Sequence, residues 1–225
     1  MELKKKFKRV GFIFGLKREM KLVSYKNNKI ICVYGYGQAS KNATQELIKL
    51  GVDIVFNFGF AGSISKNLKN GDAVFIDQIF NEKKERLSIF KFDSGLLRNL
   101  EKDFKLVRGN LLTVDKIIAD KKEKLSLAKK FKSISLIDME AFHIKKELLK
   151  AKIPMISLKV IFDDLSFDMP MFIQECINAD GDLKMVTFLR KLVFNPSIIL
   201  DLIRLNIKFV KSKKVLKGLI NNFGD

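Results

Sequence analysis

Two short apolar runs, each followed by acidic residues, dominate the stretch from residue 135 to residue 168. Residues 134–137 and 155–161 are rich in β-branched side chains and almost uncharged, which is typical of buried strands. Residues 141–152 between them are rich in helix formers, and Pro154 ends that helix before the second run. The stretch therefore predicts a strand–helix–strand unit with parallel neighbouring strands and a right-handed crossover.

Glu140 and Asp163 follow these two predicted strands directly. Ligands of open α/β sheets bind at the carboxyl edge of parallel strands, so both acids are candidate active-site residues. A purely structural role fits the same positions, because acids are favoured in the first turn of a helix and are common in loops. Asp164 is an alternative to Asp163, which we prefer because it lies closer to the strand end.

Chain length and composition indicate an α/β domain. A chain of 225 residues with 47% hydrophobic residues can bury a full core and is not disordered. We expect an α/β domain over residues 1–170 and a helical C-terminal extension of the same domain over residues 171–225. Cys32 and Cys176 lie far apart without metal-ligand spacing, which predicts a reducing cytoplasm and no metal site. The apolar runs are too short for a signal peptide or a membrane span.

The net charge of +18 indicates an anionic partner, which could be nucleic acid, phosphate or a lipid surface. Nine basic residues stand between Lys184 and Lys217 against one acid, Asp201. This basic tail contains an apolar stripe that could contact the inner face of a membrane or pack against the domain or a second subunit. The stripe consists of Ile198, Ile199, Leu202 and Leu205. A nucleic-acid interface is disfavoured, because no recognised binding motif accompanies the charge.

The rest of the chain predicts further strands and helices. Strands are expected at Val10–Phe14, 29–34, 53–58, 71–76 and 105–112, and helices at 38–50, 94–104, 119–130, 171–194 and from Pro196 onward. The strand at 29–34 is expected to be antiparallel to its neighbour, and the lysine-rich helix at 119–130 to expose its charges to solvent. Residues 59–63 are predicted to form a glycine-rich turn whose N–H groups could bind phosphate or ribose.

Six short motifs occur in a characteristic order along residues 10–170. They are Gly15-Leu16-x-x-Glu19, Gly35-Tyr36-Gly37, Asn57-x-Gly59-x-Ala61-Gly62, Gly71-Asp72, Asp138-Met139-Glu140-Ala141, and Asp163 after a buried strand. This ordered set resembles the purine nucleoside phosphorylase and methylthioadenosine nucleosidase superfamily. The later Met169-Pro170, Asp180-Gly181 and Pro196 make the chain most similar to the hopanoid-associated nucleoside phosphorylase group within it.

The resemblance implies a three-layer α/β fold with a mixed central sheet. It also implies cleavage of the N-glycosidic bond of a purine nucleoside, for which an adenosyl-hopanoid is one candidate. Asp163 would donate a proton to purine N7, Glu140 would accept hydrogen bonds from the ribose hydroxyls, and Glu19 would orient or deprotonate a water molecule. A homo-oligomer without a cofactor is implied, with water or phosphate as the nucleophile. Further implied substrate contacts are Met139, Gly59, Phe60, Ala61, Gly62, Gly37, Thr113, Asp115 and Lys159.

Several positions depart from the pattern of the superfamily. Phosphorylases carry an Arg before the glycine segment and a Ser within it, where this chain has Asn57 and Phe60. Nucleosidases carry an Arg before the late Asp, where this chain has Lys159, which could supply charge but not the bidentate fork of an Arg. These departures leave open whether water or phosphate is the nucleophile. They also keep two alternatives: a nucleoside-binding protein without catalysis and a basic nucleic-acid-binding protein.

Overall fold

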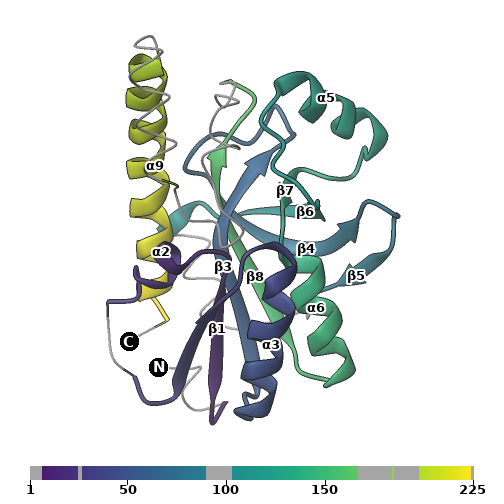
Figure 1. Cartoon of the computed structure of the whole chain (residues 1–225), viewed down its shortest axis with the longest axis vertical. Helices are drawn as coiled ribbons and strands as arrows, with labels where there is room; N and C mark the ends of the chain where they lie inside the picture. The colour runs from purple at the N-terminus through teal and green to yellow at the C-terminus, as the bar shows by residue number, and fades with distance from the viewer. Residues whose placement is uncertain (1–6, 25–26, 90–102, 167–183, 185–197, 224–225) are drawn as a thin grey trace.

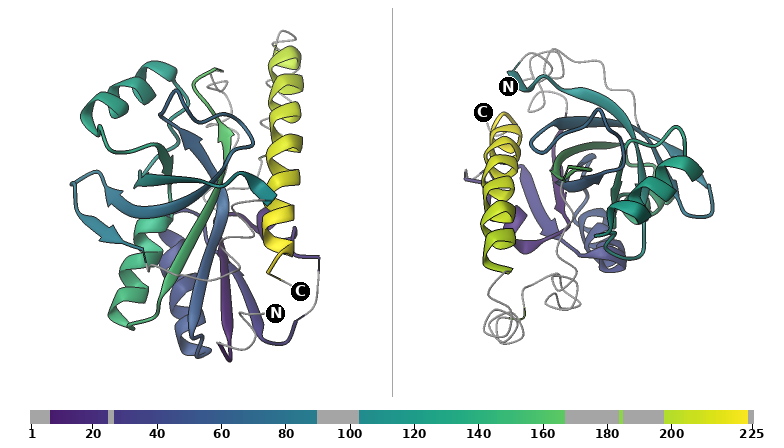
Figure 2. Two further views of the ribbon diagram at one scale, coloured as in Figure 1. Left: turned by 180° about the vertical axis from the view of Figure 1, so that it is seen from behind. Right: turned by 90° about the horizontal axis from the view of Figure 1, so that it is seen from above.

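The computed structural model describes residues 7–24, 27–89, 103–166, 184 and 198–223. The elements form three layers (Figure 1). Helices α3 (Ser40–Lys49) and α6 (Ala141–Lys150) lie side by side on one face of a central sheet, and α9 (Ile198–Asn221) covers the opposite face. Views from behind and from above show the same order of layers (Figure 2). The predicted α/β fold with a mixed sheet is confirmed.

The central sheet has eight strands among the described residues. They are β1 (Val10–Phe14), β2 (Ile30–Tyr34), β3 (Ile54–Ser63), β4 (Ala73–Asn81), β5 (Arg86–Ser88), β6 (Val107–Thr113), β7 (Leu136–Asp138) and β8 (Met155–Asp163). The pairing order is β2-β1-β3-β7-β6-β4-β5, and β8 pairs with both β3 and β4. Strands β3, β7, β6, β4 and β8 therefore form a closed ring of pairings, so this part of the sheet curls like the wall of a barrel.

Strand β2 pairs with β1 in parallel, with Val10 opposite Ile30 and Phe14 opposite Tyr34. The expected antiparallel arrangement of this strand is therefore wrong. The link between the two strands includes the short helix α2 (Lys17–Met20), and it is long enough to return the chain to the starting end of β1. As a result, the carboxyl ends of both strands lie at one edge of the sheet, next to α2.

Strands β7 and β8 are not neighbours, so the predicted parallel pair with a right-handed crossover is wrong. The end of β3 pairs with β7 in antiparallel orientation, with Gly62 opposite Ile137, whereas β8 runs parallel to β3 along most of its length. The two strands therefore lie on opposite edges of β3 and run in opposite directions. The three residues of β7 pair in parallel with β6 instead.

Residues 59–63 continue β3 and do not form the predicted turn. Glycine in a strand often marks a place where another group approaches the backbone closely. A Cβ atom at Gly59 would lie 3.3 Å from Oε1 of Glu19, and a Cβ atom at Gly62 would lie 3.2 Å from Cγ1 of Ile137. The small residues that suggested a turn thus make room for a carboxylate and for a neighbouring strand.

The C-terminal helix belongs to the main core. Phe12, Phe56 and Phe58 of β1 and β3 share a core cluster with Leu216 of α9 and with Phe223, which follows that helix. The ring centroids of Phe56 and Phe223 lie 4.7 Å apart, which is a favourable distance for aromatic contact. A helix that contributes such residues cannot be removed without exposing the core, so α9 is part of the same folded unit as the sheet.

The helix expected after Pro196 is confirmed, and it extends to Asn221. Apart from residue 184, which has no regular secondary structure, the helix predicted at 171–194 lies outside the described residues, as do most of the helix predicted at 94–104 and the boundary at residue 170. Within the described ranges, no helix combines the length and apolar character that crossing a membrane requires.

Candidate active site

A cavity of about 520 Å³ opens beside the ends of β1, β3, β7 and β8. Its volume falls within the range of roughly 300–1,000 Å³ that is typical of small-molecule sites. Glu19, Glu140 and Asp163, which lie far apart in the sequence, all line this cavity. Of the other predicted contacts, the cavity wall includes Met139, Phe60, Ala61 and Gly62.

Glu140 is 6% exposed and lies where β7 leads into α6. Its Oε1 accepts a hydrogen bond of 3.0 Å from the backbone N–H of Gly37, which has a positive φ of 53°. A Cβ atom at Gly15 would lie 3.1 Å from the carboxyl carbon of Glu140, so this position leaves room for the acid. Burial, followed by the negative charge of Asp138, raises the pKa of Glu140 to about 7.

Glu19 is 3% exposed and is fixed by two backbone groups. Its carboxylate accepts hydrogen bonds of 2.9 Å from the N–H groups of Leu16 and Phe60. Burial raises the pKa of Glu19, although these hydrogen bonds and the charge of Lys159 act in the opposite direction. Glu19 is therefore positioned rigidly and binds a proton more readily than an ordinary Glu.

Asp138, which lines the cavity, forms a fully buried ion pair with Lys159 behind it. The Nζ of Lys159 lies 2.9 Å from Oδ2 of Asp138, and the two side chains are 1% and 0% exposed. Asp138 also accepts hydrogen bonds from the hydroxyl of Thr113 (2.8 Å) and from the N–H of Ala141 (3.0 Å). Lys159 and Thr113 do not line the cavity, so both act through Asp138 and the start of α6.

Asp163 ends β8 and faces both the cavity and a buried lysine. Its Oδ2 forms an ion pair with Nζ of Lys124, a residue of α5 (Lys121–Lys130) that is 1% exposed. Its Oδ1 has no hydrogen-bond partner within the described part of the chain. Burial raises the pKa of Asp163, and Lys124 opposes that effect. The expectation that α5 exposes all its charges is wrong at this one lysine.

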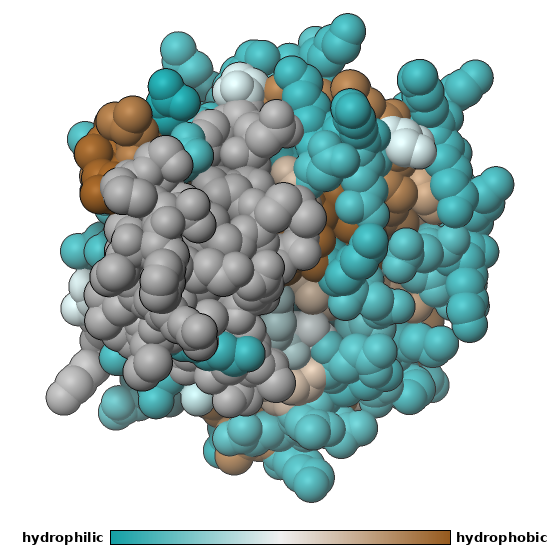
Figure 3. Space-filling view, turned by 45° about the horizontal axis from the view of Figure 1, so that its top comes forward, coloured by the Kyte–Doolittle hydropathy of each residue, from teal (hydrophilic) through white to brown (hydrophobic). Residues whose placement is uncertain are grey.

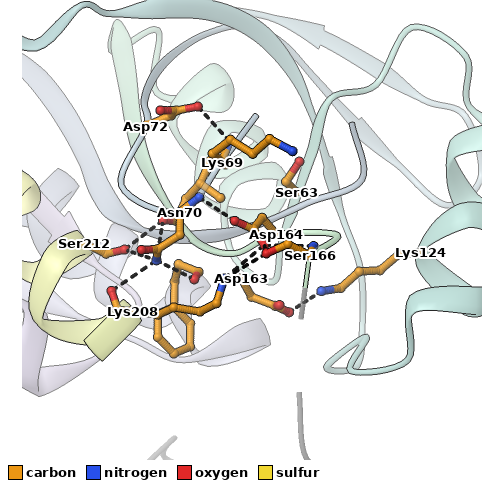
Figure 4. Close-up of polar contacts among 12 residues, drawn as sticks. Ser63, Lys69, Asn70, Asp72, Lys124, Asp163, Asp164, Ser166, Lys208 and Ser212 are labelled. Carbon is orange, nitrogen blue, oxygen red and sulfur yellow. Dashed lines mark hydrogen bonds and ion pairs between the residues drawn. The ribbon is translucent and has the colours of Figure 1, made fainter. Parts of the chain in front are cut away.

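Asp164 points to the other side of the strand end and binds α9 (Figure 4). Its carboxylate accepts hydrogen bonds from the N–H groups of Asn70 (2.8 Å) and Ser166 (2.9 Å) and from Nζ of Lys208 (3.1 Å). Burial favours the neutral form, but the hydroxyl of Ser166 and these donors outweigh it and lower the pKa of Asp164. Asn70 also donates to Ser212 of α9 (2.8 Å). Asp164 is thus an anchor for α9, and it does not line the cavity.

Three other predicted contacts lie outside the cavity wall. Gly37 reaches the site only through its N–H bond to Glu140, and Gly59 lies behind Glu19. Asp115 has a side chain that is 70% exposed, and its Oδ1 lies 4.0 Å from Nε2 of His143. Asn57, which stands where phosphorylases carry an Arg, is fully buried and accepts a hydrogen bond of 3.0 Å from Ser157.

Helix α9 supplies an apolar wall that was not predicted. Leu202, Leu205 and Phe209 line the cavity together with the acids. The ring of Phe209 lies 5.7 Å from that of Phe60 and 6.2 Å from that of Phe162, measured between centroids. The predicted apolar stripe is therefore divided, because Leu202 and Leu205 face the cavity while Ile199 is 46% exposed.

The cavity is also lined by residues that were not among the predicted contacts. Arg18 and Tyr36 line the cavity and stand within the motifs, so the motifs could have indicated them, whereas Lys124, which contacts Asp163, carries no sequence signal. The sequence pattern of the phosphorylase superfamily matches residues 4–179, which includes all three acids. The chain belongs to the phosphorylase superfamily. The comparison with curated protein sequences found no match to this chain.

Solved structures share the fold along nearly the whole chain. The 5′-methylthioadenosine/S-adenosylhomocysteine nucleosidase of Campylobacter jejuni superposes with a TM-score of 0.69 at 13% identity, covering 96% of this chain and 98% of that one. Futalosine hydrolase of Helicobacter pylori gives a TM-score of 0.65 at 20% identity, with coverage of 96% and 99%. The Neisseria meningitidis nucleosidase in complex with methylthio-immucillin-A gives 0.64 at 17% identity, with coverage of 95% and 98%. Together, superfamily and fold support a nucleoside-cleaving enzyme.

Proposed function

We propose that this protein hydrolyses the N-glycosidic bond of an adenine nucleoside that carries an apolar 5′ substituent. The observation that supports this most directly is the convergence of Glu19, Glu140 and Asp163 on one cavity. Adenine nucleosides are the substrate class suggested by the sequence resemblance and by the names of the similar structures. The apolar wall supplied by α9 supports the 5′ substituent, and an adenosyl-hopanoid is one molecule of this kind.

The three acids divide the chemistry between them in this proposal. As the bond between C1′ and N9 breaks, the ribosyl group becomes cationic and the purine gains negative charge. Asp163 gives its proton to N7 of the leaving base, a contribution worth roughly 100- to 10,000-fold in rate. Glu140 accepts hydrogen bonds from the ribose hydroxyls and stabilises the cation. A water oxygen attacks C1′, and Glu19 takes the water proton, so free adenine and a free sugar leave.

Water is the nucleophile that fits this cavity best. Phosphate would need a cation held close to C1′, but Lys159 is already occupied by Asp138, and Arg18 on the cavity wall is exposed to solvent. Asn57 is buried in the core and cannot replace the phosphate-binding Arg. The buried groups near Glu19 and Glu140 are predominantly acidic, which repels an anion and favours a neutral nucleophile.

The experiment that tests this proposal measures adenine release from adenosine, methylthioadenosine and adenosylhopane, with and without phosphate. We expect phosphate-independent release and faster turnover of the substrate with the larger apolar group. Asp163→Asn should lower the rate at least 100-fold, whereas Asp164→Asn, the matched control at the neighbouring acid, should retain most of it. Formation of a sugar 1-phosphate would show phosphorolysis instead. Tight nucleoside binding without release would identify a silent binder, and strong DNA binding at physiological salt would favour a nucleic-acid role.

The surface of α9 supports a second part of the proposal, contact with the cytoplasmic face of a membrane. Ile203, Ile207 and Val210 are 51%, 64% and 57% exposed, and basic residues flank them on the same helix. Figure 3 shows a brown apolar area on the side of the molecule where the upper end of α9 lies. Basic residues near anionic lipid contribute about 1 kcal/mol each. A homo-oligomer that covers this surface is the competing arrangement.

Flotation with anionic liposomes separates these arrangements. The wild-type chain should float, and the double substitution of Ile203→Ser and Ile207→Ser should reduce recovery without changing adenosine cleavage. Light scattering on the same samples measures the mass of the particle. Equal flotation of both proteins would exclude the membrane contact, and loss of a dimer in the double variant would assign the surface to a second copy.

A further inference from the structure

Lys124 is a charged side chain that the proposed reaction leaves without a role. It belongs to α5, where Lys121, Lys122, Lys129 and Lys130 are exposed. Burying an ammonium group costs several kcal/mol, and a buried ion pair is often no more stabilising than apolar side chains of similar size. The pair between Lys124 and Asp163 therefore needs an explanation other than stability.

The two carboxylate oxygens of Asp163 have different surroundings. Lys124 occupies Oδ2, while Oδ1 is buried and has no hydrogen-bond partner within the described residues (Figure 4). An unsatisfied buried acceptor costs about 1–3 kcal/mol, so such an atom is expected where a ligand supplies the missing donor. A purine protonated at N7 would supply that donor.

The charges around Asp163 come from three elements. Lys124 reaches it from α5, Lys208 acts from α9, and Asp164 follows it directly in the chain. Glu19 and Glu140 lie across the same cavity. Lys124 is the cation in direct contact with Asp163, whereas Lys208 contacts Asp164. Removing Lys124 would therefore leave Asp163 close to a second carboxylate with only the more distant Lys208 to compensate.

We propose that Lys124 is a positioning residue for the general acid, holding Oδ2 of Asp163 so that Oδ1 faces the leaving base. This inference rests on the proposed function. When Asp163 transfers its proton to N7, the carboxylate that forms lies against the ammonium of Lys124, which stabilises it. The proton that Asp163 loses is regained from solvent after the base leaves.

The decisive variant is Lys124→Met, which removes the charge and keeps the length of the side chain. General-acid catalysis fails as pH rises through the pKa of the acid, and loss of Lys124 raises that pKa. The basic limb of kcat/KM should therefore move to higher pH, and kcat at neutral pH should fall about 10- to 100-fold because the carboxyl is held less well. Lys124→Arg, which keeps a positive charge, should leave the limb near its wild-type position.

Lys122→Met is the matched control, because Lys122 is an exposed lysine two residues before Lys124 on the same helix. A lower kcat with an unmoved pH limb in Lys124→Met would reduce Lys124 to a structural residue and overturn the proposal. If Lys124→Met does not fold, Lys124→Gln provides the same comparison. In all these proteins the pKa of Asp163 is measured by NMR on ¹³C-labelled aspartate, with Asp163→Asn to assign the signal.

The NMR titration separates this inference from the proposed function. A wild-type chain that releases no base from any nucleoside would remove the proposed function. A higher pKa of Asp163 in Lys124→Met would still support the coupling between the two residues. Equal pKa values for Asp163 in the wild-type and Met proteins would end it, whatever the activity.

Discussion

Two groups of buried charges line or support the same cavity, and they are neutralised differently. The floor cluster consists of Glu19, Asp138, Glu140 and Lys159, so three carboxyl groups share one ammonium. The strand-end cluster consists of Asp163, Asp164, Lys124 and Lys208, in which each carboxylate contacts its own lysine. One end of the cavity therefore has an excess of acid, and the other is balanced.

The difference assigns different tasks to the two clusters. The floor cluster cannot keep all its carboxyl groups ionised, and burial with the charge of Asp138 raises the pKa of Glu140 to about 7. A cationic ribosyl group would relieve this excess, which suits the transition state of glycosidic cleavage. The strand-end cluster has no such excess, so its lysines can adjust each carboxyl group separately, one for proton transfer and one for anchoring α9.

Lys159→Met should have the largest effect, because it removes the one cation of the floor cluster. Breaking a buried ion pair from one side costs about 3–5 kcal/mol of unfolding free energy, since Asp138 is left charged without a partner. Urea unfolding measures this loss. The matched control is Lys150→Met in the exposed pair with Glu147, where about 1 kcal/mol or less is expected. Equal losses in the two variants would contradict the description of the floor as uncompensated.

Glu140→Gln should have the next largest effect, and on turnover more than on folding. The amide can still accept the N–H of Gly37, but it no longer offers a negative charge to the sugar. We expect kcat to fall by about 100- to 1,000-fold, the usual cost of losing one electrostatic contact in a transition state. Glu147→Gln, at a partly buried acid farther along the same helix and outside the cavity, is the control. A Glu140→Gln protein with normal turnover would remove Glu140 from the sugar site.

The pH dependence of stability provides a third test of the floor cluster. Glu140 has a raised pKa in the folded protein, so its contribution to stability is present below about pH 4.5 and is lost as pH rises through about 7. The unfolding free energy should fall across this window by up to about 3 kcal/mol. Glu140→Gln should flatten the curve there. A wild-type curve that rises steadily from pH 4.5 to 7 would show that Glu140 is an ordinary ionised acid.

The three acids could be singled out from the sequence because each follows an apolar strand or its turn, and all three line the cavity, while their catalytic roles stay predictions. Glu140 and Asp163 stand at or just after strand ends and Glu19 stands in the short helix after β1, all within short motifs that can be recognised locally. The pairing of strands was harder to predict, because β3 continues through Gly59 and Gly62 and pairs on both edges. Whether a glycine segment turns or extends depends on which groups approach it, and those groups come from distant parts of the chain.

Lys124 illustrates what local patterns cannot show. Five lysines lie on α5, and all five have the same immediate character in the sequence. One of them is buried because α5 lies over the end of β8, a contact that no periodicity of residues 119–130 reveals. The same holds for Asp163 and Asp164, which are adjacent in sequence yet point to different lysines (Figure 4).

The smallest effect is expected for Lys208→Met, which tests whether the strand-end cluster is really two separate pairs. Lys208 has a side chain that is 18% exposed, and Asp164 keeps its bonds from Asn70 and Ser166 without it. We expect a loss of about 1–2 kcal/mol in urea unfolding, compared with Lys214→Met as an exposed control on α9. Because α9 forms part of the cavity wall, KM for a nucleoside with a large 5′ group should rise a few-fold. The value of kcat and the pH position of the basic limb of kcat/KM should stay unchanged. A shift of that limb like the one expected for Lys124→Met would mean that both lysines act on one shared acid, and the division between proton transfer and anchoring would not hold.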